Sequence, residues 1–368
     1  MNKDPFKEYI RESEPAKRDK GYAWHTAIGL QAVDGLKTSE YLVYTAVRNI
    51  ECEISFEEAN ALLQIYYEEN PTRDASDRTE EADKVSARIA ALLSERAFSF
   101  TPNEYLSIHR KLFTGIYSHA GRIRDYNITK KEWVLNGATV LCGSATELRA
   151  TLDYDFSEEK KFSYRNLSMD EIIHHLAFFV SRLWQIHVFA EGNTRTTAVF
   201  FIKYLRTLGF DVTNDIFAEN AWYFRNSLVR ANYNDLKNGI HETTEYLELF
   251  LRNLLLNENH PLHNRTLHIS GTFKFNFENI FQSTFMLAFF TTVGLGASFT
   301  LLKKGGKLLI IYWLTCGIIS ILQNVIGMTI SKTTGLEAPY ALLSSAISMV
   351  GGHGAALAYG DTFAKMGY

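Results

Sequence analysis

This chain of 368 residues has few cysteines, no excess of positive charge and no apolar segment at its N-terminus, and each of these features argues against a class of protein. Its three cysteines, Cys52, Cys142 and Cys316, lie far apart and form no CxxC pair or metal-binding spacing, so we expect free thiols in a reducing compartment. Lysine and arginine (38) do not outnumber aspartate and glutamate (41), which gives no argument for a nucleic-acid partner. The charged first residues contain no apolar signal-peptide core, so we expect a cytoplasmic N-terminal part.

Side chains with catalytic chemistry are concentrated in one segment, His187-Val-Phe-Ala-Glu-Gly-Asn-Thr-Arg-Thr196. A helix-period apolar pattern precedes this segment and begins at a capping box, Ser168-Met-Asp-Glu171. A second helical pattern runs from Asn193 to Leu208, and Gly209 is placed to end it. We therefore predict a loop that ends at a helix N-terminus, where free backbone N–H groups and the helix dipole favour an anion.

The residue types in this loop suit phosphoryl or nucleotidyl transfer. His187 can take a proton from an attacking hydroxyl near neutral pH. Glu191 is a single carboxylate of the kind that binds Mg²⁺, which keeps several waters and takes further ligands from substrate phosphates. Gly192 permits close approach of the backbone to a phosphate, and Arg195 can bind phosphate oxygens through two hydrogen bonds. Positioning and charge neutralisation provide most of the catalysis in such reactions.

The segment resembles the motif of Fic-domain proteins, H-P-F-x-[DE]-G-N-G-R-x-x-R, and the resemblance extends from about Phe98 to about Leu255. It implies a mainly α-helical Fic-fold core and Mg²⁺-dependent transfer of AMP from ATP to a Ser, Thr or Tyr hydroxyl of a target protein. By position, it also implies that His187 and Arg195 are catalytic and that Glu191 binds the metal. The residues that it implies for ATP binding are Gly192, Asn193, Thr194, Arg195, Tyr223 and Asn232.

Three positions depart from the family motif. Val188 replaces a proline, which loosens the loop but removes no chemistry. Thr194 replaces a glycine, so we expect its Cβ to face the phosphate site. Ala198 stands where the second arginine is expected, so Arg122 or Arg124 would have to help hold the terminal phosphate. Two alternatives follow: transfer of a different phosphate-containing group, and a non-catalytic scaffold that binds nucleotide.

Residues 1–75 are predicted to form short helices in a layout similar to the antitoxins that silence Fic toxins. Those partners carry an inhibitory S-x-x-x-E-G helix whose glutamate pairs with the second motif arginine. The corresponding regulatory residues here are Asp34 and Gly35; Glu51 is a rival position, and a plain helix stop at Gly35 is the other interpretation. Because Ala198 removes the usual cation, any restraint by this segment has to be steric or use a different cation.

The clearest strand signal lies at 129–141, where Asn136-Gly137 separates two β-prone runs and predicts a hairpin turn. In Fic proteins such a flap borders the active site, and the target protein aligns on it by strand addition. The resemblance therefore implies a target protein docked along 129–141, with ATP as the other ligand. The alternative is a hairpin without a binding role.

The composition changes abruptly in the last third of the chain. Two apolar runs, 285–302 and 308–330, are near the length that spans a bilayer, and the lysines between them predict a cytoplasmic connection. A third run, 341–359, contains Gly351-Gly-His-Gly, and glycine-broken apolar segments of this kind mark transporter binding sites. From Asn276 onward the chain resembles sodium/glutamate symporters. One partial repeat cannot enclose a substrate path, so we expect no transport by this chain alone.

The expected fold is mainly α: a helical core with a small β-hairpin flap, followed by two or three membrane-type helices. We expect the membrane segment to tether the catalytic part to the inner face of the cell membrane. The expected parts are an antitoxin-like segment (1–75), a Fic catalytic domain (76–262), a linker (263–278) and a partial symporter-like membrane segment (279–368).

Overall fold

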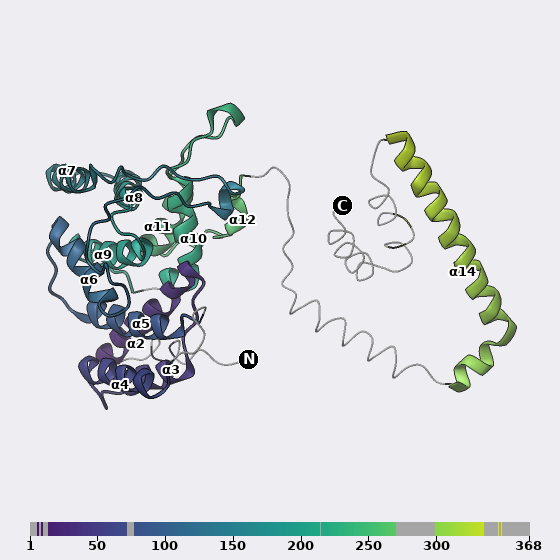
Figure 1. Cartoon of the computed structure of the whole chain (residues 1–368), viewed down its shortest axis with the longest axis horizontal. Coiled ribbons are helices and arrows are strands. Elements are labelled where there is room, and N and C mark those ends of the chain that lie inside the picture. The colour runs from purple at the N-terminus through teal and green to yellow at the C-terminus, as the bar shows by residue number, and fades with distance from the viewer. Residues whose placement is uncertain are drawn as a thin grey trace. The chain divides into compact units, whose positions relative to one another are not determined.

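The structure is a computed structural model and describes residues 6, 9, 14–71, 77–213, 215–269, 299–334, 345 and 347. The chain divides into two compact units, Met1–Phe273 and Lys274–Tyr368 (Figure 1). Both units are helical in their described residues, so the prediction of a mainly α-helical protein is confirmed.

The first unit contains α-helices and short 3₁₀ helices (η) that follow one another with brief connections. Their bounds are α2 Pro15–Gly29, η1 Leu30–Asp34, α3 Glu40–Ile50, α4 Phe56–Glu69, α5 Thr79–Ser94, α6 Pro102–Phe113, η2 Trp133–Leu135, α7 Leu148–Lys161, α8 Met169–Ile186, α9 Asn193–Thr207, α10 Ile216–Arg230, η3 Leu236–Asn238, α11 Glu245–Leu256 and α12 Asn264–Leu267. In Figure 1, α2 to α5 lie at one end of this unit, and α7 and α8 lie at the other.

The capping signals in the sequence set the starts of two important helices. Ser55 accepts a hydrogen bond from the Glu58 backbone N–H at 3.1 Å, and the Glu58 carboxylate accepts one from the Ser55 N–H at 2.7 Å. Ser168 and Glu171 form the same reciprocal pair at the start of α8. Both capping boxes satisfy N–H groups that the first helical turn leaves without partners.

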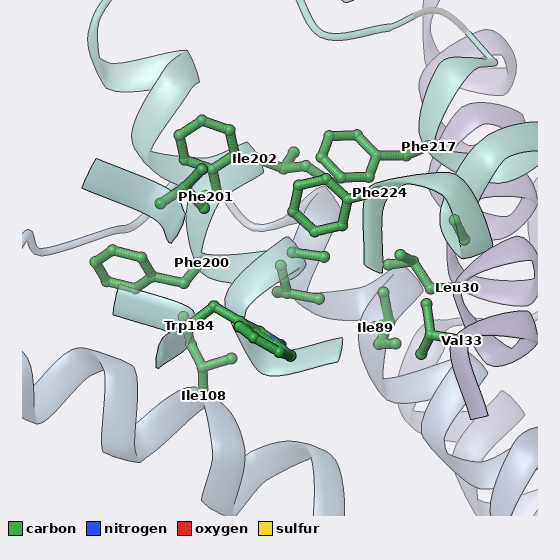
Figure 2. Packing of buried hydrophobic residues seen from close by; sticks show 14 of the residues in the cluster. Leu30, Val33, Ile89, Ile108, Trp184, Phe200, Phe201, Ile202, Phe217 and Phe224 are labelled. Carbon is green, nitrogen blue, oxygen red and sulfur yellow. The ribbon is translucent and has the colours of Figure 1, made fainter. Parts of the chain in front are cut away.

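Helix α9 lies at the centre of the first unit and is buried on all sides. Every residue from Asn193 to Leu205 is buried, because α5, α6, α8 and η1 all pack against this helix. Figure 2 shows Phe200, Phe201 and Ile202 of α9 within the core, with Phe217 and Phe224 close by. A helix enclosed in this way is a rigid base for the loop that precedes it.

The N-terminal segment packs into the same core and is not a separate module. Leu30 and Val33 of η1 lie beside Ile89 of α5 (Figure 2). Within this segment, α2 continues directly into the tighter turns of η1. Gly35 ends η1 in the left-handed conformation (φ 69°), as expected for a helix stop.

The predicted hairpin at 129–141 is reduced to a single antiparallel bridge between Lys131 and Thr139, and the described residues contain no strand. Val134 and Leu135 are both buried, at 0% and 1% exposure, although neighbouring strand residues point to opposite faces. Burial of consecutive side chains therefore favours the η2 turn. We keep the name "flap" for residues 129–141.

The second unit contributes α14, Phe299–Thr334, to the described residues. Within α14, Leu314–Lys332 is long and apolar enough to cross a membrane, and it is the one such helix in the part of the chain that the structure describes. The lysine-rich connection predicted before it is helical, with a kink at Gly306 (φ 42°). Most of the expected runs at 285–302 and 341–359 lies outside the described residues, so two or three membrane helices are not confirmed.

Candidate functional site

A loop connects α8 to α9, as predicted, and the structure places a left-handed residue at each end of it. His187 (φ 50°) ends α8, and Gly192 (φ 75°) begins α9. A Cβ atom built on Gly192 would lie 2.5 Å from Cε2 of Phe113. Glycine is therefore needed both for the backbone conformation and for close packing against Phe113, a reason that the sequence did not reveal.

His187 is held as a neutral imidazole with a defined tautomer. Its Nδ1 lies 3.0 Å from the carbonyl oxygen of Trp184. Because a carbonyl can only accept, Nδ1 carries the proton and Nε2 keeps its lone pair. The pKa of His187 is lowered to about 4, mainly by burial; the positive charges of Lys130, Arg124 and Arg225 contribute to this shift, and the hydrogen bond to Trp184 opposes it. The ring is therefore neutral at neutral pH, with its one proton on Nδ1.

Arg124 fixes the backbone around His187. Its guanidinium donates to the carbonyl oxygens of His187 at 2.7 Å, Tyr126 at 2.5 Å and Gly143 at 2.5 Å. The side chain is 5% exposed. The expectation that Arg124 helps to hold a phosphate is therefore wrong, because backbone carbonyls already occupy its donors. Arg122 is exposed.

Internal contacts fix the rest of the loop. The Asn193 side chain donates to the Phe189 carbonyl at 2.7 Å and accepts from the Phe189 N–H at 3.0 Å. The Phe189 ring stacks on His109 with ring centroids 3.7 Å apart. His109 accepts a hydrogen bond from the Gly121 N–H at Nδ1, so its Nε2–H donates to the Glu191 carbonyl at 3.0 Å. Asn193 is thus engaged in shaping the loop.

The first turn of α9 leaves backbone N–H groups for an anion. The first helical bond of this turn runs from the Thr196 N–H to the Gly192 carbonyl, so the N–H groups of residues 193 to 195 have no acceptor among the described residues. The Thr194 hydroxyl accepts from Trp184 Nε1 at 3.0 Å, and the side chain is 8% exposed. Thr194 is therefore directed into the protein, and the expectation that it faces the phosphate site is wrong.

Glu191 is the exposed carboxylate of the loop. No group of three or more His, Cys, Asp or Glu side chains that could hold a metal occurs in the described residues. A divalent cation here would therefore need Glu191 together with oxygen atoms from water and a bound phosphate. Mg²⁺ is commonly held in that way, so a single exposed carboxylate beside unpaired N–H groups fits it.

Arg195 is fully buried and is surrounded by polar groups of the N-terminal segment and α5. Its Nε lies 2.9 Å from Asp34 Oδ2, and its Nη2 lies 2.7 Å from Glu81 Oε1. The Gln31 side-chain carbonyl accepts from Nη1 at 3.0 Å, and the Tyr117 hydroxyl lies 3.1 Å from Nη2. Two carboxylates therefore compensate its charge, and Asp34 pairs with the first arginine of the motif in place of the missing second one.

Tyr223 and Asn232 belong to the framework around α10. Tyr223 is 1% exposed, and its hydroxyl has no hydrogen-bond partner among the described residues. Burial raises the pKa of this hydroxyl, so it stays protonated. Asn232 donates to the carbonyl oxygens of Ser181 at 3.0 Å and Leu228 at 2.9 Å, which ties the end of α10 to α8.

Glu81 is the main residue around Arg195 that sequence reasoning missed, although the sequence contained a signal for it. Glu81, Val85 and Ile89 are spaced by four residues and therefore share one face of α5. Because Val85 and Ile89 make that face apolar, the pattern indicates that Glu81 is buried. A buried carboxylate needs a cationic partner. Its partner, Arg195, could not be identified without the fold.

Burial of His109 predicts an acid-sensitive fold. Burial lowers the pKa of His109 from 6.5 to about 4. The unfolded chain therefore binds this proton below about pH 6.5, whereas the folded chain binds it only near pH 4, so stability falls as the pH falls between these values. In urea unfolding of the full chain, the free energy of unfolding should fall between pH 7 and pH 4.5 by roughly 2 kcal/mol more in wild type than in His109→Gln. Equal pH dependence in both chains would contradict this assignment.

Comparison with known protein families finds two matches in separate parts of the chain. Residues 99–205 match the profile of the Fic/DOC family, and this range contains α6 to α8, the loop between α8 and α9 and most of α9. Residues 263–368 match the profile described as sodium/glutamate symporter. The two resemblances found in the sequence are therefore confirmed for these ranges.

The C-terminal match is supported by individual relatives. The sodium/glutamate symporter of Haemophilus influenzae is 44% identical over 96 residues, which cover 26% of this chain and 24% of that protein. The symporter of Escherichia coli (strain K12) is 34% identical over 88 residues, which cover 24% of this chain and 22% of that protein. The chain thus spans about a quarter of the length of the curated relatives that it matches.

Proposed function

We propose that this protein catalyses Mg²⁺-dependent transfer of AMP from ATP to a Ser, Thr or Tyr hydroxyl of a target protein. The match to the Fic/DOC family supports a transferase of the Fic type. The observation that supports the proposal most strongly is the state of His187. Its Nδ1–H is bonded to the Trp184 carbonyl, so Nε2 keeps a lone pair, and the loop that begins at His187 leads directly to the N-terminus of α9.

The residues of the loop have separate roles in this reaction. The target hydroxyl gives its proton to Nε2 of His187 while its oxygen attacks the α-phosphorus of ATP, and the bond from that phosphorus to the leaving pyrophosphate breaks. The N–H groups at the start of α9 stabilise the phosphate charge. Glu191 would hold Mg²⁺, which neutralises phosphate charge when bound. Arg124 keeps the His187 carbonyl fixed, which positions the imidazole.

We also propose that the N-terminal segment restrains this site through Arg195. Asp34 and Gln31 come from η1 and contact the guanidinium directly, while Glu81 contacts it from α5. A fully buried arginine with two carboxylate partners cannot bind a phosphate until some of these contacts break. Restraint by Asp34 therefore acts on the first motif arginine, a different cation from the one used in the family pattern.

The same geometry favours one alternative, transfer of another phosphate-containing group. Ala198 supplies no cation, Arg124 is engaged by backbone carbonyls, and the charge of Arg195 is compensated. The site therefore has few cations for the terminal phosphate of ATP. A donor with fewer phosphates would need less charge compensation.

Two further proposals concern the surroundings of the site. A target protein would dock along the flap. The charge of Lys130 in the flap acts on His187, and Gly143, just beyond the flap, accepts a hydrogen bond from Arg124, which also donates to the His187 carbonyl. The segment from 279 to 368 would associate with a membrane through α14 and so place the catalytic unit at its inner face.

Donor labelling tests the proposed reaction. The full chain is incubated with Mg²⁺, a cell lysate and ATP that carries label in either the α-phosphate or the γ-phosphate. AMP transfer labels protein from α-labelled ATP alone, whereas label from the γ position would show phosphate transfer. ATP binding without any labelled protein would contradict the proposal and favour a nucleotide-binding scaffold.

A further inference from the structure

The folded first unit does not end with α11, because the chain returns and packs against the flap. We call residues 264–269, which comprise α12 and the two residues after it, the strap. The Ile269 backbone N–H donates to the Val134 carbonyl at 3.0 Å. The His268 ring lies against the Trp133 ring, with centroids 5.0 Å apart and planes at 55°. Two consecutive strap residues therefore contact two consecutive residues of η2 in the flap.

The other end of the strap is fixed to α10. Asn226, which is fully buried, donates through Nδ2 to Asn264 Oδ1 at 2.7 Å. Leu267 is 0% exposed and belongs to the main hydrophobic core. The approach to the strap is also ordered, because the Asn253 side chain pairs with the backbone N–H and carbonyl of His260 at 2.8 Å each.

The flap has a second attachment to the same part of α10. Arg225 Nη2 lies 2.7 Å from Glu132 Oε2, and the two side chains are 6% and 4% exposed. Arg225 Nη1 also donates to Asn226 Oδ1 at 3.3 Å. Neighbouring residues of α10 therefore hold the flap and the strap in one connected buried network, which runs from Glu132 through Arg225 and Asn226 to Asn264.

We propose that the strap is a positioning element that sets the place of the flap beside His187. The buried pair of Glu132 and Arg225 fixes one side of the flap, and the strap fixes η2 from the other side. Residues 264–269 fall inside the range that matches the symporter family, yet they pack on the catalytic unit, whose compact part extends to Phe273. The segment that leads into the C-terminal unit is thus part of the catalytic unit. Its consequence for catalysis rests on the proposed function.

Hydrogen exchange on the full chain in detergent tests the strap. Ile269→Pro removes the N–H that bonds to Val134, whereas Ile269→Ala removes the side chain and keeps that N–H. In Ile269→Pro the flap amides from 132 to 138 should exchange roughly five- to tenfold faster than in Ile269→Ala, because one fixing hydrogen bond is lost. The loop from 187 to 192 should keep its protection in both variants, which would show that the unit remains folded.

Equal flap exchange in the two variants would overturn the proposal. Hydrogen exchange does not require enzyme turnover, so it tests the strap whether or not the protein transfers AMP. If the wild-type chain labels protein from α-labelled ATP, Ile269→Pro should lower that labelling severalfold. Ile269→Ala should label protein at nearly the wild-type rate. Faster exchange of the flap amides in Ile269→Pro, with no labelled protein from any chain, would support the role of the strap and reject the proposed function. Faster exchange throughout the unit in Ile269→Pro would also overturn the proposal, because the bond would then support the fold in general.

Discussion

His187→Ala should lower AMP transfer by the full chain about 10³-fold, because removal of a positioned general base typically costs 10² to 10⁴ in rate. The change deletes the Nε2 lone pair that we assign to the target hydroxyl. It leaves the N–H groups of the α9 N-terminus and the Glu191 carboxylate in place, so Mg²⁺ and nucleotide should still bind. The measurement is the initial rate of protein labelling from α-labelled ATP.

His174→Ala is the matched control for this substitution. His174 also lies on α8, but its side chain is 67% exposed and pairs with Glu248 at 2.7 Å. Transfer by this control should stay within about twofold of wild type, as is usual for surface substitutions. Loss of labelling in His174→Ala to the same extent as in His187→Ala would show that the change acts through α8 and not through a base. Full activity of His187→Ala would remove His187 from the mechanism.

Asp34→Asn should raise AMP transfer roughly tenfold, which corresponds to a shift of about 1.4 kcal/mol in the equilibrium that exposes Arg195. The substitution keeps the size of the side chain and removes its charge from Arg195, which lies 2.9 Å away. Glu81 still pairs with the guanidinium, so Arg195 is not left as an uncompensated buried charge. The unfolding midpoint of the variant should be measured alongside its rate.

Glu40→Gln provides the control for charge removal in the same N-terminal segment. Glu40 is exposed in the first turn of α3. This variant should transfer AMP at the wild-type rate, because its carboxylate is not among the groups around Arg195. A slower Asp34→Asn enzyme with an unchanged unfolding midpoint would show that Asp34 orients Arg195 for catalysis, and it would reject restraint by η1.

Local sequence patterns predicted the parts of this site that depend on nearby residues. The capping box at Ser168 and the left-handed position at Gly192 are short-range features, so the loop and the start of α9 could be located from the sequence. Contacts between residues that lie far apart in the sequence could not be predicted in this way. The donors of Arg124 are occupied by carbonyls up to 63 residues away, and Arg195 meets Glu81 at a separation of 114 residues.

The flap shows how burial can override a turn signal. Asn136 and Gly137 both adopt positive φ, as the hairpin prediction required. The residues before them, however, bury Val134 and Leu135 together, and alternation between two faces is lost. The sequence contained β-prone residues but did not reveal that α10 and α12 would pack against η2.

The two family matches leave residues 206–262 between them, and the strap lies at the start of the second match. The Fic/DOC match ends at 205, but the helices that complete the first unit continue through α12. The symporter match begins at 263, inside that unit. The start of the symporter-like range therefore packs as part of the first unit, which also contains the Fic/DOC match.

The most direct test of the account compares four full-length chains: wild type, His187→Ala, Asp34→Asn and the double variant. Each is incubated with Mg²⁺, α-labelled ATP and the same lysate, and the initial rate of protein labelling is recorded. We predict that Asp34→Asn is faster than wild type and that both chains with His187→Ala are equally close to background. Rapid labelling by the double variant would contradict the account, because the activity released from η1 would then not depend on His187.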